Sequence, residues 1–304
     1  MPETFTTHEI AAGAWAAVAP GTAGPAVSNA AILDLGDKTV VVDTFMTLPA
    51  AEELQAEAHR LTGRAPFLVV NSHWHSDHVY GNQIFADIPI AGTRRMLELI
   101  VEDAPTREDL DGYVGNLRTT ATEIAATADS PDQDELAAGT LALAEALATT
   151  ATRFQLTLPD VLIGDRLDIE GERSLSIIHS GNGHTESDLF LHLIDEDVVV
   201  TGDLLWTAMH PKADDGFPAE WAASVAAIAQ LAPKALISGH GSPATPADLA
   251  AMGQYMKDLD GLVAAVRAGD VDPETAEPPP GSEDWQGLAR FRKGLAGLAT
   301  QDGR

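Results

Sequence analysis

Apolar and polar residues alternate along the first third of the chain in a pattern that predicts β-strands. Short apolar segments are separated by Gly, Asp, Asn and Pro, the residues that favour turns. The triplet Gly-Asp-Lys at 36–38 separates two such segments and predicts a β-hairpin. Strands are expected in this part of the chain at 13–18, 30–35, 39–43, 67–70 and 88–91.

Helical spacing appears first at residues 49–62. Leu54, Ala58 and Leu61 recur at intervals of four and three residues, which places them on one face of a helix. Gly63 follows and is expected to end this helix, since glycine is common just after a helix C-terminus. Another helix is expected to begin within 79–85, and further helices are expected at 221–231, 246–267 and 283–299.

Residues 94–153 differ in composition from their surroundings. Ala, Thr, Glu and Leu dominate and β-branched runs disappear, so we expect two or three helices inserted between strands. One of them should be amphipathic and begin near Pro131, with an apolar face formed by Leu136, Leu141, Leu143 and Leu147. Two interpretations stay open for this insert: plain structural packing, or a cap over a functional site.

The second half returns to strands, followed by helices. Strands are expected at 163–169, 175–179, 188–194, 198–201 and 235–238. This order predicts an α/β fold, a four-layer sandwich of two mixed sheets with outer helices and a helical insert. We divide the chain into one main domain, the insert, and a Pro-rich linker with a short C-terminal helix, at 1–93 with 154–269, 94–153, and 270–304.

Composition narrows the functional classes. The 304 residues carry a formal net charge of −28, which disfavours a nucleic-acid partner because like charges repel. There is no cysteine, so disulfides and thiolate metal ligands are excluded. The chain has no apolar run of 18 residues and no basic start typical of a secretion signal. We therefore expect no membrane span and a cytoplasmic location.

The segment at 71–78, Asn-Ser-His-Trp-His-Ser-Asp-His, concentrates metal-ligating residues directly after an apolar strand. Imidazole suits zinc and similar metals, and carboxylate suits a harder position. His73 and His75 are two residues apart, so they point the same way in an extended segment. Asp77 and His78 are adjacent and can diverge toward a second ion.

Three more polar residues stand at expected strand ends, and each follows a glycine. They are His184, Asp203 and His240. Glycine permits tight turns and a close approach of the backbone. A single Gly-His pair is usually structural, but three such positions combined with the histidine-rich segment predict a metal centre.

The order His-x-His-x-Asp-His, then His, Asp and His, resembles that of the metallo-β-lactamase superfamily over about residues 25–245. The resemblance implies that His73, His75 and His184 hold one ion, that Asp77, His78 and His240 hold another, and that Asp203 bridges them. It implies two zinc ions, with iron or manganese as alternatives. Asp43 matches the acidic residue that the family places at the end of an early strand, where it would orient the ligand loop.

The resemblance also implies a reaction class. A hydroxide between two metal ions would attack an ester, lactone or thioester carbonyl of a small-molecule substrate. Asp77 would take and return the proton. β-Lactam hydrolysis is expected as a side activity at most, since true zinc β-lactamases generally lack a bridging carboxylate at the position of Asp203.

Several alternatives stay open within and beyond this class. A glyoxalase II type thioester hydrolase, an acyl-homoserine lactone type lactonase and a one-iron persulfide dioxygenase share much of the motif. A non-catalytic scaffold on the same fold is the alternative from a different class, and a homodimer is the candidate assembly. A diiron flavoprotein is disfavoured because it would have Glu in place of His75.

The nearest local similarity is to the SoxH-like branch, whose motifs match residues 71–82 and 202–206, followed by His210-Pro211 and Asp215-Gly216. Trp206 and His210 are accordingly candidates for lining the substrate pocket, with loop packing as the alternative.

Overall fold

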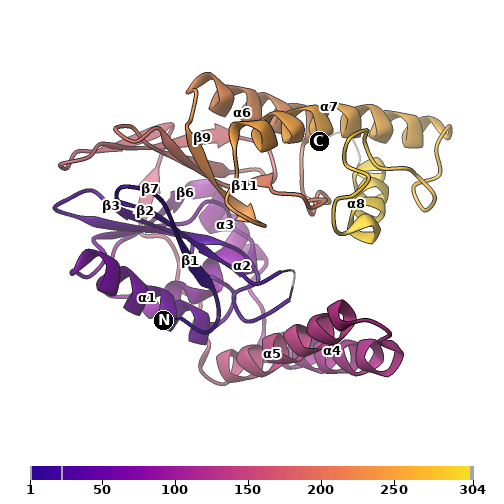
Figure 1. The fold of residues 1–304 in the computed structure, drawn as a ribbon, viewed down its shortest axis with the longest axis horizontal. Helices are drawn as coiled ribbons and strands as arrows, with labels where there is room; N and C mark the ends of the chain where they lie inside the picture. Colours follow the sequence, from indigo (N-terminus) through magenta and orange to yellow (C-terminus); the bar gives the residue numbers. More distant parts are fainter. Residues whose placement is uncertain (1, 22, 302–304) are drawn as a thin grey trace. The chain divides into compact units, whose positions relative to one another are not determined.

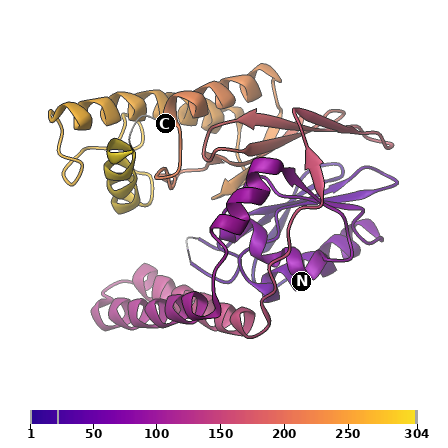
Figure 2. The ribbon, with the colours of Figure 1, turned by 180° about the vertical axis from the view of Figure 1, so that it is seen from behind.

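The computed structural model describes residues 2–21 and 23–301. The chain forms two compact units. The first comprises Met1–Ile163 and Glu170–Arg173, and the second comprises Gly164–Ile169 and Ser174–Arg304. Each unit contains one β-sheet and its own helices (Figures 1 and 2).

The first unit is built on a mixed seven-stranded sheet in which the strands follow one another in chain order. The first four strands are antiparallel neighbours, and the last four are parallel neighbours. Their bounds are β1 Thr6–Ala11, β2 Ala14–Val18, β3 Ala30–Asp34, β4 Thr39–Val42, β5 Leu68–Val70, β6 Ile90–Thr93 and β7 Val161–Ile163. The parallel strands matter for function because their carboxyl ends meet at one edge of the sheet.

The helices of this unit are α1 Leu48–Thr62, α2 Ser76–Val79, the 3-10 helix η1 Tyr80–Phe85, α3 Arg94–Glu102, α4 Arg107–Thr127 and α5 Pro131–Arg153. Helix α1 ends at Gly63, which adopts the left-handed conformation with φ of 73°, as expected. Its buried Leu54 and Ala58 pack into a core that also contains Ile32 of β3 and Phe45, which follows β4.

Helices α3, α4 and α5 account for residues 94–153. Helices α4 and α5 run side by side (Figures 1 and 2), and their shared core includes Leu110, Val114 and Leu147. The predicted apolar face of α5 was wrong in two positions, since Leu136 and Leu141 are 40% and 47% exposed. The buried face instead follows the helical period through small residues, namely Ala137, Thr140, Leu143, Ala144, Leu147, Thr150 and Ala151. The leucines alone were therefore a misleading guide to this face.

The second unit contains a mixed five-stranded sheet in the order β12-β11-β10-β9-β8. Strands β11 and β12 are parallel, and the other pairs are antiparallel. The bounds are β8 Arg166–Ile169, β9 Leu175–Gly181, β10 Asp188–Leu193, β11 Val198–Trp206, β12 Ala235–His240, α6 Pro218–Gln230, α7 Pro246–Ala268 and α8 Leu288–Thr300. Trp221 of α6, Met252 of α7 and Leu236 of β12 belong to one buried core.

The fold class is confirmed as α/β with two mixed sheets and helices. Three strand predictions need correction. Residues 163–169 form two strands in different sheets rather than one, because the chain turns at Gly164 and Asp165. Strand β11 continues past 201 to Trp206. Strand β1 was not predicted, since its residues are mostly polar and lie at the edge of the sheet.

None of the helices in the described part of the chain is long and apolar enough to cross a membrane.

Candidate metal-binding clusters

The histidine-rich segment begins at the carboxyl end of β5 and lies beside the end of β4, its parallel neighbour. Its backbone is anchored by buried amides and hydroxyls. The carbonyl oxygen of His78 accepts hydrogen bonds from the backbone N–H of Thr44 at 2.9 Å, from Thr44 Oγ1 at 3.1 Å and from Asn71 Nδ2 at 3.3 Å. Asn82 Nδ2 donates to Asn71 Oδ1 at 2.8 Å. The loop is thus tied to the sheet on both sides of its histidines.

Gly81 allows this loop to approach the residues after β4. A Cβ atom at position 81 would lie 1.9 Å from the carbonyl oxygen of Thr44. No side chain fits at that distance. The close packing of the loop against the end of β4 therefore requires glycine here.

Asp43 is the buried acid at the end of β4, and it contacts the loop directly. Its carboxylate accepts hydrogen bonds from Ser72 N at 2.7 Å and Ser72 Oγ at 2.7 Å. Its Oδ2 also lies 2.8 Å from His78 Nδ1. Asp43 has a φ of 64°, an uncommon conformation for a residue other than glycine. This backbone conformation belongs to the turn that brings the carboxylate against the loop.

These contacts indicate which ring nitrogen of His73 and of His78 carries the lone pair that a metal ion would need. The single hydroxyl proton of Ser72 is donated to Asp43, so Ser72 Oγ must accept from His73 Nδ1, 3.0 Å away. His78 Nδ1 likewise donates to the Asp43 carboxylate. In a neutral imidazole the other nitrogen then carries the lone pair. His73 Nε2 and His78 Nε2 are therefore set up as ligand atoms.

The first unit's ligand atoms lie at separations that suit a metal ion. His73 Nε2 lies 3.0 Å from His75 Nδ1. Two nitrogens on one tetrahedral zinc, each about 2.0–2.1 Å from it, would be about 3.3 Å apart. The rings of His73 and His78 lie 4.2 Å apart between centroids, and Asp77 Oδ2 lies 3.6 Å from His78 Nε2. Within the first unit these histidines and Asp77 therefore form a largely buried His/Asp cluster that could bind metal.

The second unit brings together the other three predicted ligands. Asp203 Oδ2 lies 3.2 Å from His184 Nε2 and 3.4 Å from His240 Nε2. Both separations again match those expected between two ligand atoms of one zinc ion. A single carboxylate oxygen thus lies between two histidines, and all three side chains are buried.

Glycine and aromatic rings shape this second cluster. A Cβ at Gly239 would lie 1.9 Å from Asp203 Oδ1, so only glycine leaves space for the carboxylate. The indole of Trp206 stacks on His240, with 3.7 Å between centroids and 20° between planes. Trp221 meets His184 edge to face at 5.0 Å. Trp221 Nε1 donates to the carbonyl oxygen of Leu204.

Asp188, at the start of β10, was not predicted as part of the site. Its carboxylate accepts from Thr185 N at 3.2 Å and from Thr185 Oγ1 at 2.7 Å, directly after His184. The spacing Thr-x-x-Asp was a signal in the sequence, because short polar side chains three residues apart commonly fix a turn.

Trp206 and His210 were predicted as pocket-lining residues. Arg290 of α8 lies 5.2 Å from the Trp206 ring centre. His210 is fully buried, contacts Tyr255 OH through Nδ1 at 3.1 Å and lies near the Phe291 ring. Burial, and secondarily the charge of Arg290, lower the pKa of His210 to about 4. Contact of either residue with a substrate stays a prediction.

A family model for the metallo-beta-lactamase superfamily matches residues 23–240. This range contains all seven predicted ligands. The chain belongs to the metallo-beta-lactamase superfamily. No curated protein has a significantly similar sequence, and the SoxH-like resemblance stays a prediction.

Solved metallo-beta-lactamases share the fold of this chain. One from Pontibacter korlensis has 15% identity and a TM-score of 0.60, and the match covers 84% of this chain and 99% of that one. FIM-1 from Pseudomonas aeruginosa, solved in a mono-zinc form, has 17% identity and a TM-score of 0.60, with 84% and 95% covered. One from Hirschia baltica has 18% identity and a TM-score of 0.58, with 84% and 98% covered. At these identities the likeness concerns the fold.

Proposed function

We propose that this superfamily member is a hydrolase that uses two divalent metal ions. The observation that carries the proposal is the position of Asp203 Oδ2 between His184 Nε2 and His240 Nε2. A carboxylate between two histidine ligands is suited to contact two ions at once. The order of the ligands along the chain resembles the superfamily pattern, which assigns His73, His75 and His184 to one ion and Asp77, His78 and His240 to the other, with Asp203 shared.

The chemistry of the donors supports zinc. The seven side chains offer five imidazole nitrogens and two carboxylates, and there is no cysteine in the chain. Nitrogen and oxygen donors suit zinc, and also iron or manganese. Bound ions of this kind supply Lewis acidity and a water of lowered pKa. Asp43 would keep His78 in the tautomer that binds metal, as carboxylates beside metal-binding histidines do elsewhere.

The protein groups then have distinct roles. Asp77 is 19% exposed at its side chain, more than His78 at 0%, so it can reach a substrate-side proton. We assign to it the movement of a proton to the leaving group. The buried histidines would hold and orient the metal ions. The buried carboxylate of Asp203 would keep negative charge between His184 and His240. This set of roles suits hydrolysis of an ester, a lactone or a thioester.

β-Lactams are proposed as poor substrates. The motivation is Asp203 together with the absence of cysteine. The net charge of −28 favours a small-molecule substrate over a nucleic acid. We also propose a cytoplasmic location.

The test is a hydrolase panel run on metal-analysed protein purified without chelator. Lactones, thioesters, esters, β-lactams, phosphodiesters and sulfate esters are compared at equal concentration. We expect about two ions per chain, with the highest kcat/KM on a carbonyl ester, lactone or thioester. One iron and no second ion would instead support the persulfide dioxygenase. Two ions without turnover of any substrate would support a non-catalytic scaffold.

A further inference from the structure

The C-terminal segment of the second unit is bonded to the loop that follows β11. His210 N donates to the carbonyl oxygen of Gln286 at 2.9 Å, and Gln286 N donates to the carbonyl oxygen of Ala208 at 3.0 Å. Arg290, in the first turn of α8, adds a bond from its Nη1 to the carbonyl oxygen of His210 at 2.8 Å. These hydrogen bonds hold residues 208–210 of the loop.

The backbone of this loop is strained at Ala208. Its φ of 55° lies in the left-handed region, which is unfavourable for a residue with a Cβ atom. The bond from Gln286 to the Ala208 carbonyl oxygen is one of the contacts that keep this conformation. Trp206 lies two residues earlier, at the end of β11. The C-terminal segment therefore supports the backbone from which the Trp206 side chain projects.

The indole of Trp206 is oriented by packing rather than by a hydrogen bond. Trp206 is 5% exposed, and among the described residues its Nε1 has no hydrogen-bond partner. A buried indole N–H usually has one, as at Trp221, whose Nε1 donates to the carbonyl oxygen of Leu204 at 2.9 Å. The orientation of Trp206 thus depends on the groups that contact its ring.

His240 and Arg290 both contact this ring. The His240 imidazole stacks on it, with 3.7 Å between centroids and 20° between planes. The guanidinium carbon of Arg290 lies 5.2 Å from the ring centre, within the reach of about 6 Å that a cation–π contact has. A cation from the C-terminal helix and a proposed metal ligand therefore share one aromatic neighbour.

The local structure at the start of α8 accommodates Arg290 at some expense to the helix. A cation in the first turn opposes the helix dipole, and α8 has no acidic residue there. Gly287, just before the helix, has a φ of 92°, and a Cβ at this position would lie 3.1 Å from Arg290 Nη1. Glycine thus leaves the space that the guanidinium occupies. The contacts with the loop and with Trp206, rather than the stability of α8, explain the position of Arg290.

We propose that Arg290 is a positioning residue for the metal ligand His240, acting through Trp206 and the loop after β11. With the guanidinium in place, the indole helps to keep His240 Nε2 beside Asp203 Oδ2, 3.4 Å away. Without it, the indole and the imidazole gain freedom, and a less well oriented histidine binds metal more weakly. The proposal rests on the proposed metal-dependent function and adds a positioning residue to it.

The first experiment measures the zinc dissociation constants of the full chain by chelator competition. Arg290→Gln keeps an N–H donor but removes the cation, whereas Arg290→Lys keeps a cation. We expect zinc to bind roughly 3- to 10-fold more weakly to Arg290→Gln, and Arg290→Lys to recover most of the affinity. Equal zinc affinity in wild-type protein and Arg290→Gln would overturn the proposal.

Arg267 of α7 offers a matched control, because it holds the other end of α8. Its Nη2 donates to the carbonyl oxygens of Leu298 at 2.8 Å and Gln301 at 3.1 Å. Arg267→Gln should lower the free energy of unfolding in a denaturant titration and leave zinc affinity unchanged. An equal loss of zinc affinity in Arg267→Gln and Arg290→Gln would mean that the docking of α8, rather than Arg290, supports the site, and would overturn the proposal.

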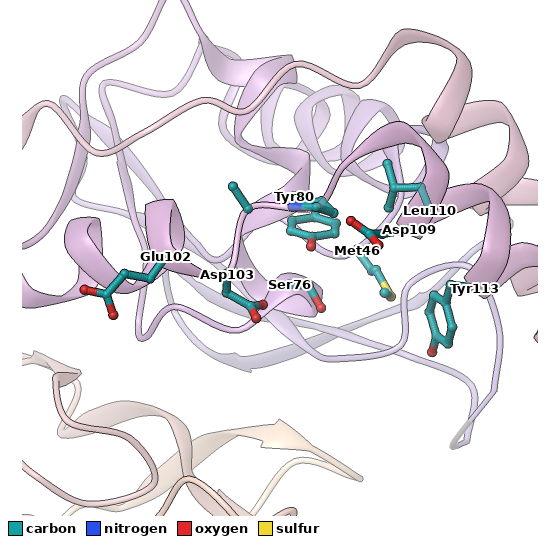
Figure 3. A pocket seen from close by; sticks show the side chains of 10 residues that line it. Met46, Ser76, Tyr80, Glu102, Asp103, Asp109, Leu110 and Tyr113 are labelled. Atoms are coloured by element: carbon teal, nitrogen blue, oxygen red, sulfur yellow. The ribbon is translucent and has the colours of Figure 1, made fainter.

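Turnover distinguishes a positioning residue from a substrate contact. In the first unit, a cavity of about 460 Å³ beside the histidine-rich loop is lined by Ser76 and Tyr80 among other residues of that unit (Figure 3). Neither Arg290 nor Trp206 lines it. At saturating zinc, Arg290→Gln should therefore keep the wild-type KM and recover kcat on the best substrate of the panel. A raised KM at saturating zinc would mean that Arg290 contacts the substrate instead of positioning His240.

A spectroscopic measurement separates this proposal from the hydrolase function. The chain has five tryptophans, and in protein labelled with 5-fluorotryptophan the loss of one ¹⁹F signal in Trp206→Phe identifies Trp206. In metal-free protein, Arg290→Gln should shift or broaden this signal and leave those of Trp15 and Trp74 in the first unit unchanged. A displaced Trp206 signal and weaker zinc binding, in a protein that hydrolyses nothing in the panel, would support the positioning role and refute the hydrolase. An unmoved Trp206 signal would refute the positioning role whatever the activity.

Discussion

The two units hold their histidines by different physical means. In the first unit, Asp43 and Ser72 fix ring nitrogens of His73 and His78 through hydrogen bonds. In the second unit, aromatic rings also contact the histidines, with Trp206 stacked on His240 and Trp221 against His184. Hydrogen bonds select both orientation and tautomer. Ring stacking selects orientation alone and acts through a weaker, less directional contact.

The difference affects how each unit should respond to substitution. Some carboxylates accept several buried hydrogen bonds. When such a carboxylate is replaced, some of its donors are left unsatisfied. When a stacked ring is replaced by a smaller ring, contact area is lost but no polar group is left without a partner. We therefore expect larger losses from polar changes in either cluster than from the aromatic change.

The largest effect is expected from Asp203→Asn. The amide cannot supply two anionic oxygens between His184 and His240, so the metal content should fall from about two ions to about one. Activity should fall roughly 100-fold or more. Metal analysis and kcat/KM on the best substrate of the panel measure both effects. The control is Asp260→Asn, on an exposed position of α7. Two tightly bound ions and full activity in Asp203→Asn would contradict the proposed role.

Asp43→Asn tests the hydrogen-bonded half of the comparison. Asparagine can accept from Ser72 or face His78, but it cannot serve all three donors. We expect roughly 10- to 100-fold weaker metal binding and a loss of about 1–3 kcal/mol in the free energy of unfolding. Chelator competition and denaturant titration measure them. Asp87→Asn, exposed in the same unit, should change neither. Unaltered metal affinity in Asp43→Asn would show that the hydrogen bonds serve the fold alone.

The same contrast explains which parts of the site could be predicted from the sequence. In the first unit the ligands and their supporting residues are close in the chain, since Asn71, Ser72 and Asn82 flank the histidines. A single segment therefore predicted a metal cluster, and its position after a buried strand is confirmed. Asp43 could be proposed because it matches the acidic residue that the superfamily places at the end of an early strand.

The second unit was harder to read because its supporting contacts come from distant segments. Trp221 lies on α6 and Arg290 on α8, and nothing in the local pattern links them to His184 or Trp206. The strand boundaries failed for a related reason. Asp203 was placed after a strand, yet β11 continues to Trp206 across register shifts near Gly202. Pairing with a neighbouring strand, rather than local hydrophobicity, decided where that strand ends.

His210 lies among aromatic rings of the second unit, and we expect it to make the free energy of unfolding depend on pH. Its folded pKa of about 4 lies below the ordinary value of about 6.5. As the pH falls from 7 to 5, the unfolded chain binds a proton that the folded chain does not, so the folded state loses stability. The expected loss from this group is about 2 kcal/mol.

The measurement compares metal-free wild-type protein with His210→Gln at both pH values. Glutamine retains a hydrogen-bonding group for Tyr255 but does not titrate in this range. The difference in unfolding free energy between the two proteins should therefore shift by about 2 kcal/mol in favour of the variant at the lower pH. A constant difference between pH 7 and 5 would mean that the pKa of His210 is the same in the folded and unfolded states.

The smallest effect is expected from Trp206→Phe, which tests the aromatic half of the comparison. Phenylalanine keeps a ring over His240 but loses part of the 3.7 Å stack and part of the contact with Arg290. Aromatic pairs contribute about 0.5–1.5 kcal/mol, so metal affinity should weaken by roughly 3- to 10-fold. Trp285→Phe is the matched control, because Trp285 stacks on Tyr255 at 5.1 Å rather than on a proposed ligand. It should lower the free energy of unfolding and leave metal affinity unchanged. If both variants lose stability and neither loses metal affinity, Trp206 is a packing residue. If only KM rises in Trp206→Phe, the indole contacts the substrate instead of positioning His240.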